Sequence, residues 1–177
     1  LSGDDLARWS ANIEAPVSYE YRNHTVFKCG PWSQGPVFLQ QLAILNGFDI
    51  AAMDPNGAEF VHHVTEASKL AFADREKFYG DPDFIDVPMD TLLSTAYNAE
   101  RRSLISGQAS TRIRPGTIPG YGGAVVYGQE DGSRFQVLDS GDTVPVDEGR
   151  DSISIATGDK VHLDVADRHG NLVSITP

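Results

Sequence analysis

The sequence predicts an α+β fold, and three observations support that prediction. Apolar side chains recur at spacings of three and four over residues 58–78, which is typical of a helix packed on a core. Polar and apolar residues alternate in two short regions, 17–28 and 161–176, which is typical of β-hairpins. Residues 108–149 contain repeated glycine and proline and show no period. A chain of 177 residues can bury a core without disulfides or metals.

The N-terminal region is predicted to form a short helix and then a hairpin. Ser2 precedes a glycine and two aspartates, which is typical of a helix N-cap, and the helix is expected to reach Trp9. Residues 17–22 and 25–28 are expected to pair as antiparallel strands that turn at 22–24.

The segment 30–36 interrupts regular structure, because it contains two glycines and two prolines. It leads into a predicted helix over residues 37–45, which Asn46 and Gly47 end. We take 30–36 as a candidate functional loop.

Two further helices are predicted in the middle of the chain. The first covers 58–78 and stops at the turn 80–83, and the second covers 90–105 and is capped by Gly107. The segment 108–149 is expected to be mobile, or ordered only by a partner.

The chain is predicted to end in a second hairpin. Residues 161–166 and 172–176 alternate, and the turn between them contains Gly170. Because the sequence begins without methionine and stops inside this strand, we expect it to be a piece of a longer protein.

Composition excludes several classes of protein. Fourteen Lys and Arg against 25 Asp and Glu give a net charge of −11, which argues against a nucleic-acid partner. No apolar run approaches the roughly 20 residues of a membrane-spanning helix. Cys29 is the single cysteine, so no internal disulfide or cysteine-based zinc site is expected.

No metal or cofactor site is predicted from the motifs. His62 and Glu66 lie one turn apart on a helix with His63 and Asp74, but the His-Glu-x-x-His order of a zinc protease is missing, so ordinary polar contacts are the simpler interpretation. Asp81, Asp83 and Asp86 lack the glycine and glutamate of a calcium loop and are expected to cap turns. Ser33 lacks the first glycine of a nucleophile elbow, and the glycines at 120–123 fit no nucleotide-binding pattern.

Residues 63–83, which read His-Val-Thr-Glu-Ala-Ser-Lys-Leu-Ala-Phe-Ala-Asp-Arg-Glu-Lys-Phe-Tyr-Gly-Asp-Pro-Asp, resemble the helix-and-turn motif of the γ-glutamyltransferases, also called γ-glutamyltranspeptidases or glutathione hydrolases. The resemblance covers nearly the whole chain except 115–150. Further agreement, in order, is found at Asp5-Leu6, Tyr21-Arg22, 30–36, 45–49, 81–84, 87–88 and 167–171.

The resemblance implies a fragment of the four-layer αββα sandwich of N-terminal nucleophile hydrolases. Members are made as one precursor that cuts itself before a threonine, and this threonine, with its freed α-amine as base, then transfers or hydrolyses γ-glutamyl groups. It implies late large-subunit helices in 1–107, an extended segment leading to the processing junction in 108–159, and the first small-subunit hairpin in 160–177. The implied partners are a γ-glutamyl substrate such as glutathione and the remainder of the precursor, with no cofactor.

Alignment with the family on His162, Asp167 and Gly170 places its nucleophilic threonine at position 160, where this sequence has Lys160. The implied cleavage junction therefore lies between Asp159 and Lys160. Lysine has no β-hydroxyl for the N-to-O acyl shift, and its ammonium is protonated at neutral pH. We expect this chain to be unprocessed and inactive.

Several interpretations of this position are open. In the first, Lys160 is a replacement that inactivates an enzyme. In the second, it indicates a non-catalytic binding protein on the same fold, and in the third it is an unusual lysine nucleophile. Thr157 as a shifted nucleophile would put the wrong residues on the hairpin face. His162 is either a site residue or, more simply, a hydrogen-bonded strand histidine.

The resemblance leaves the remaining site residues and the substrate open. The family's substrate-binding residues fall outside this sequence, so none is assigned here. Gly158-Asp159 and His162-Leu163-Asp164 differ from the best-known transpeptidases, so a related amidase or acylase with another substrate is an alternative. Family members are commonly exported, which suggests a periplasmic or secreted location by resemblance only.

Overall fold

The computed structural model describes residues 2–11, 13–121, 125–128, 134–137, 143–145, 163–169 and 172–175. It combines helices and strands, which confirms the predicted α+β class. The helices are α1 (Gly3–Arg8), α2 (Gly35–Leu45), the 3₁₀ turn η1 (Ile50–Ala52), α3 (Ala58–Phe78), α4 (Met89–Leu92) and α5 (Thr95–Ser103). The strands are β1 (Val17–Tyr21), β2 (His24–Lys28), β3 (Val125–Gly128), β4 (Arg134–Val137), β5 (Thr143–Pro145), β6 (Leu163–Ala166) and β7 (Leu172–Ile175).

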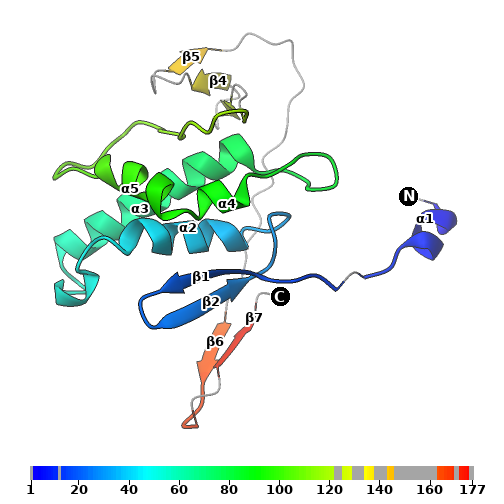
Figure 1. Cartoon of the computed structure of the whole chain (residues 1–177), viewed down its shortest axis with the longest axis horizontal. Coiled ribbons are helices and arrows are strands. Elements are labelled where there is room, and N and C mark those ends of the chain that lie inside the picture. Colours follow the sequence, from blue (N-terminus) through cyan, green and yellow to red (C-terminus); the bar gives the residue numbers. More distant parts are fainter. Residues whose placement is uncertain are drawn as a thin grey trace.

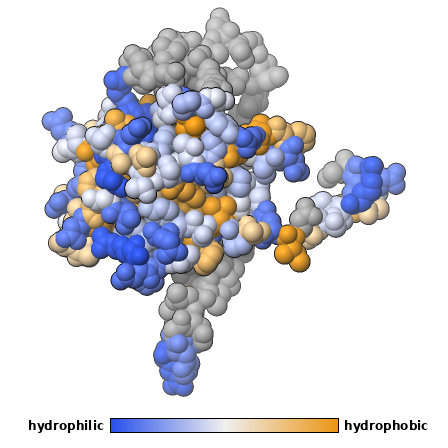
Figure 2. Space-filling model, in the orientation of Figure 1, coloured by the Kyte–Doolittle hydropathy of each residue, from blue (hydrophilic) through white to orange (hydrophobic). Residues whose placement is uncertain are grey.

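The N-terminal helix α1 has the predicted cap. The Ser2 hydroxyl accepts a hydrogen bond from the Asp5 amide at 3.3 Å, and the Ser2 amide donates to the Asp5 carboxylate at 2.8 Å. These reciprocal bonds satisfy amide groups that the first turn leaves open. In Figures 1 and 2 the arm that carries α1 stands away from the helical body.

The first predicted hairpin is also confirmed. Strands β1 and β2 pair antiparallel, with Val17 opposite Lys28 and Tyr21 opposite His24. The tight turn uses Arg22 in the left-handed region, at φ 55°. The hairpin packs against α2.

Helices α2 and α3 lie side by side and form the main core (Figure 1). The helical period of the sequence brings apolar residues of both helices to one interface, where each fully buried aliphatic side chain contributes roughly 1.5–3 kcal/mol. That cluster consists of Val37, Ile44, Leu45, Ala67, Leu70 and Ala71. A second cluster, at the end of α3, consists of Phe78, Val87, Leu92, Tyr97 and Ile118.

The single helix predicted over 90–105 is wrong, because the structure has two helices there. Ser94 adopts an extended conformation, and its hydroxyl accepts from the Tyr97 amide at 3.3 Å as the N-cap of α5. The side-chain amide of Asn98 donates to the Leu92 carbonyl at 2.8 Å, which α4 leaves open where it ends. The cap at Ser94 therefore replaces helix continuation, and α5 ends at Ser103 rather than near Gly107.

The described part of 108–149 contains regular structure that the missing period of the sequence did not predict, whereas its predicted mobility stays a prediction. Strands β3, β4 and β5 form an antiparallel sheet, with Val125 opposite Val137 and Phe135 opposite Pro145. Residues 110–116 are hydrogen-bonded to α3. Buried carboxylates of α3 hold residues 110–116 in place, and the local sequence pattern does not reveal these contacts.

The C-terminal hairpin is confirmed. Strands β6 and β7 pair antiparallel, with Leu163 opposite Ile175 and Ala166 opposite Leu172. In the turn, the Asp167 carboxylate accepts from the His169 amide at 2.8 Å. Among the described residues, no helix combines the length and apolarity needed to cross a bilayer.

Candidate functional site

Helix α3 carries two carboxylates on its buried face. Glu66 is 1% exposed and Asp74 is 0% exposed, and they lie eight residues apart, or about two helical turns. Both therefore point to the side that also presents Leu70 to the core. Buried carboxylates are rare unless they are paired, so their partners decide what this face of the helix does.

Asp74 joins three other parts of the chain. It accepts hydrogen bonds from the Gln40 side-chain amide of α2 at 2.6 Å and from Arg101 Nε of α5 at 3.0 Å. Its second oxygen accepts from the Gly116 amide at 2.6 Å. Burial raises the pKa of Asp74, while the Arg101 charge and the Gly116 and Gln40 hydrogen bonds oppose that rise.

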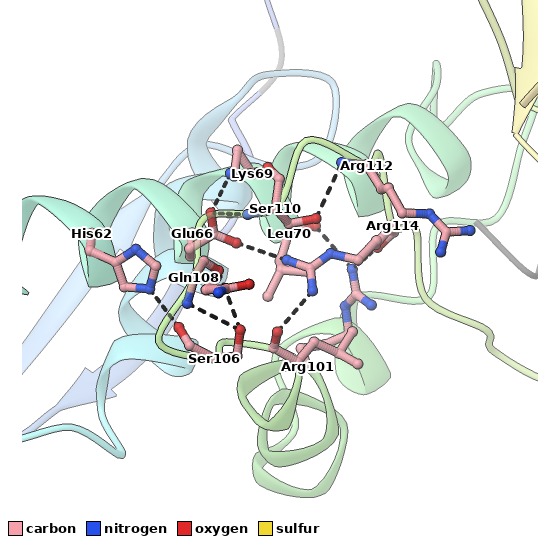
Figure 3. A network of polar contacts seen from close by, with 11 residues as sticks. His62, Glu66, Lys69, Leu70, Arg101, Ser106, Gln108, Ser110, Arg112 and Arg114 are labelled. Atoms are coloured by element: carbon pink, nitrogen blue, oxygen red, sulfur yellow. Dashed lines mark hydrogen bonds and ion pairs between the residues drawn. The ribbon is translucent and has the colours of Figure 1, made fainter. Parts of the chain in front are cut away.

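Glu66 binds the same downstream segment two turns earlier (Figure 3). One oxygen accepts from the Ser110 amide at 3.0 Å and pairs with Lys69, and the other accepts from Arg114 Nη2 at 2.8 Å. Burial alone would raise the pKa of Glu66, but the hydrogen bonds and charges of Lys69, Ser110 and Arg114 together hold it below its ordinary value.

The cations around these acids also bind backbone carbonyls. Lys69 donates to the Ser110 carbonyl at 2.5 Å, and Arg114 Nη1 donates to the Leu104 carbonyl at 2.8 Å. Arg101 donates to the Arg114 carbonyl and, at 3.4 Å, to the Leu70 carbonyl. We call Glu66, Asp74 and the segment 110–116 that they bind the acid clamp.

Gly116 fits the acid clamp because it has no side chain. A Cβ at this position would lie 2.0 Å from the Tyr97 hydroxyl oxygen and 3.2 Å from Asp74 Oδ1. The backbone therefore approaches α3 and α5 closely enough to donate its amide to Asp74. The clamp can anchor a segment of chain, and its carboxylate oxygens are occupied by that task.

The residues predicted at the processing site lie outside the described part of the structure. These are Asp159 and Lys160, together with Thr157 and His162. Their roles stay predictions, and the described β6 begins three positions after residue 160.

The Ser33 hydroxyl forms two described hydrogen bonds within its own loop. Its hydroxyl donates to the Gly30 carbonyl at 2.9 Å and accepts from the Gly35 amide at 3.0 Å, at the start of α2. This arrangement orders the turn rather than activating the hydroxyl as a nucleophile.

The loop 30–36 borders a cavity of about 590 Å³ at the C-terminal end of α3. Its lining includes Trp32, Arg75, Tyr79 and Asp81. Burial and the charge of Asp74 raise the pKa of Tyr79, so the phenol is neutral at physiological pH. The candidate functional loop therefore lies beside a polar cavity, but no nucleophile and base are paired there among the described residues.

The polar residues considered for metal binding take part in other contacts. Nε2 of His62 donates to the Ser106 carbonyl at 2.7 Å, and His63 Nδ1 contacts the Glu59 carbonyl at 2.8 Å. Asp81 accepts from the Asp83 amide at 3.0 Å in a turn. Within the described ranges, no three His, Cys, Asp or Glu side chains converge as a metal site.

The sequence patterns identified the acids of α3 but not their role. Two signals point to it in retrospect: carboxylates on the apolar face of a strongly periodic helix, and four arginines in 101–114 that could compensate them. Their partners lie 42 and 48 positions away at Gly116 and Arg114, so no local window contains both sides of the contact.

Comparison with known proteins finds a family match along the whole chain. A family model described as Gamma-glutamyltranspeptidase matches residues 1–177. The Glutathione hydrolase proenzyme of Bacillus subtilis subsp. natto is 30% identical, over 99% of this chain and 27% of the relative.

Solved structures agree with that match. The crystal structure of cephalosporin acylase from Bacillus halodurans is 36% identical with a TM-score of 0.61, over 66% of this chain and 21% of that one. The structure of Helicobacter pylori gamma-glutamyltranspeptidase is 29% identical with a TM-score of 0.63, over 68% of this chain and 36% of that one. The chain spans about a quarter of the length of the natto relative.

Proposed function

The chain belongs to the γ-glutamyltranspeptidase family, and from this premise we propose that it is part of a proenzyme built for self-processing and for γ-glutamyl transfer or hydrolysis, in which Lys160 stands at the position of the nucleophile. The substrate class is a γ-glutamyl amide such as glutathione, and the partner is the remainder of the precursor. The observation that carries the proposal is that the family match runs through residues 1–177 and so includes position 160.

The proposed chemistry starts from the family's threonine at that position. Its hydroxyl attacks the carbonyl carbon of residue 159, the hydroxyl proton passes to the departing amide nitrogen, and the peptide bond is exchanged for an ester. Water then hydrolyses the ester, which frees a carboxylate on Asp159 and the threonine hydroxyl and α-amine. The freed amine serves as base when the hydroxyl attacks a γ-glutamyl amide.

With Lys160 at this position, the chain lacks the hydroxyl oxygen on which every one of these steps depends. Its side chain has no β-hydroxyl to form the ester, and a lysine amine is ordinarily protonated, and so not nucleophilic, at neutral pH. We therefore expect the protein to stay uncut between Asp159 and Lys160 and to lack γ-glutamyl transfer.

The test is the intact mass of the denatured full-length protein after incubation at 37 °C, compared with its Lys160→Thr variant. The threonine variant is expected to split between residues 159 and 160 while the lysine protein stays whole. Lys160→Val is the matched control, since valine has the β-branched shape of threonine without its hydroxyl. If Lys160→Thr also stays whole, the proenzyme proposal fails and a non-catalytic binding protein on the same fold takes its place.

A second candidate is an acylase that acts on another amide. It is favoured by the 36% identity to the cephalosporin acylase and by the unusual residues at 158–164. The processed Lys160→Thr protein would be assayed with a γ-glutamyl anilide and with a cephalosporin that carries an amide-linked acyl chain. Faster release from the anilide supports the γ-glutamyl proposal, and faster release from the cephalosporin supports the acylase.

A further inference from the structure

We propose that the acid clamp is the fixed end of the chain that leads to the processing junction. In a form of the protein that is cut between residues 159 and 160, residues 110–121 stay docked on the helices. The position of the junction rests on the proposed function, whereas the docking rests on contacts of the described residues.

The first argument is electrostatic. If residues 110–116 left α3, Asp74 would lose the Gly116 amide, and Glu66 would lose the Ser110 amide and Arg114. Glu66 and Asp74 are buried in the helix face, so removing their donors leaves buried charge that is only partly compensated. Such a loss costs far more than breaking an exposed ion pair.

The second argument is packing. Immediately after the clamp, Ile118 is 4% exposed and belongs to the cluster that contains Phe78, Leu92 and Tyr97. The Tyr121 hydroxyl then donates to the Asp86 carboxylate at 2.5 Å. The docked segment therefore contributes both hydrogen bonds and apolar contacts to the body formed by α3, α4 and α5.

These contacts are independent of the bond at the junction. The described donors at Ser110, Arg114 and Gly116 lie more than forty positions before residue 159, so these three bonds do not include the cleaved peptide bond. The proposal therefore keeps residues 110–121 docked, although they fall within the segment 108–149 that glycine and proline content predicts to be mobile.

The test is amide hydrogen exchange at Ser110 and Gly116 in the full-length protein before and after the chain is cut. The cut form is made in two ways: by Lys160→Thr, and by a site-specific protease sequence that replaces residues 156–161. We expect exchange at both amides to change by less than about twofold on cutting. Acceleration of roughly tenfold or more at both amides would overturn the proposal.

Two variants test whether the clamp itself holds the segment. Arg114→Gln removes the ion pair with Glu66, and Gly116→Ala places a methyl group against the Tyr97 hydroxyl. Both are expected to accelerate exchange at Ser110 by roughly tenfold, with α2 unchanged. The matched controls are Arg8→Gln, at a salt bridge whose arginine is 77% exposed, and Thr117→Ala, an exposed neighbour.

The outcomes separate the two proposals. If Arg114→Gln and Gly116→Ala leave exchange at Ser110 unchanged, the clamp does not hold the segment and the inference fails. If Lys160→Thr is not cut, the proposed function fails, but the protease-cut form still decides whether residues 110–121 stay docked.

Discussion

Asp74 and Glu66 occupy the same face of one helix, yet their environments move their pKa values in opposite directions. Asp74 is enclosed by the core, so burial dominates and raises its pKa. Burial also acts to raise the pKa of Glu66, but the charges of Lys69 and Arg114 and the hydrogen bond from the Ser110 amide outweigh it and lower the pKa. The side chains of Lys69 and Arg114 keep partial access to water. The charged form of Glu66 is thus favoured by folding, whereas that of Asp74 is disfavoured.

The sign of the Glu66 shift predicts a pH dependence. Because its folded pKa is lowered, Glu66 contributes stability that is present above the ordinary glutamate range and is lost as pH falls through the lowered value. Glu66→Gln should reduce the free energy of unfolding by about 1–3 kcal/mol at pH 7 and by much less under acid conditions in which the wild-type carboxyl is also protonated.

Urea unfolding of the full-length protein across this pH range measures the difference. Glu59→Gln is the control, since Glu59 is an exposed acid on the same helix and its loss should cost little at any pH. If the loss of unfolding free energy in Glu66→Gln stays constant down to acid pH, the explanation based on the Glu66 ion pairs is wrong.

At the scale of elements, the quality of the sequence-based prediction depends on how local the deciding contacts are. Helix α3 runs from Ala58 to Phe78 as predicted, because a long apolar period and the turn after it lie within one stretch of chain. The hairpins were also predictable from alternation. The docking of 110–116 was not, because its acids and its donors are more than forty positions apart.

The break between α4 and α5 is decided by one hydroxyl. Ser94 accepts from the Tyr97 amide at 3.3 Å and donates to the Thr91 carbonyl at 2.8 Å, so it serves both helix ends. Periodicity alone does not distinguish a serine inside a helix from one that starts a helix, which is why 90–105 was predicted as continuous.

Ser94→Ala should therefore lower the free energy of unfolding by about 1–2 kcal/mol, and Ser94→Asp should restore most of it because aspartate also caps helices. Chemical denaturation of the full-length protein provides the measurement. Ser103→Ala removes a hydroxyl bonded to the Glu100 carbonyl at the exposed end of α5 and is the matched control. If Ser94→Ala and Ser103→Ala lower the free energy of unfolding equally, the Ser94 cap does not determine the break between α4 and α5.

At the scale of the whole molecule, resemblance and physical pattern contribute different information. The motif at 63–83 identified the family, and the match over residues 1–177 confirms it. Composition and periodicity led only to an acidic α+β chain. The predicted junction at Asp159 and Lys160 comes from alignment alone, and it stays a prediction until the cleavage experiment is done.

The two tryptophans of the chain both lie at its surface, with Trp9 75% exposed beside α1 and Trp32 59% exposed in the loop 30–36. Neither belongs to the core clusters around α3. Intrinsic tryptophan fluorescence of this chain therefore reports on the N-terminal arm and on the rim of the cavity, while melting of the helical core is followed by circular dichroism. The same exposure makes indole emission an optical signal for any surface that comes to cover the arm in the parent protein.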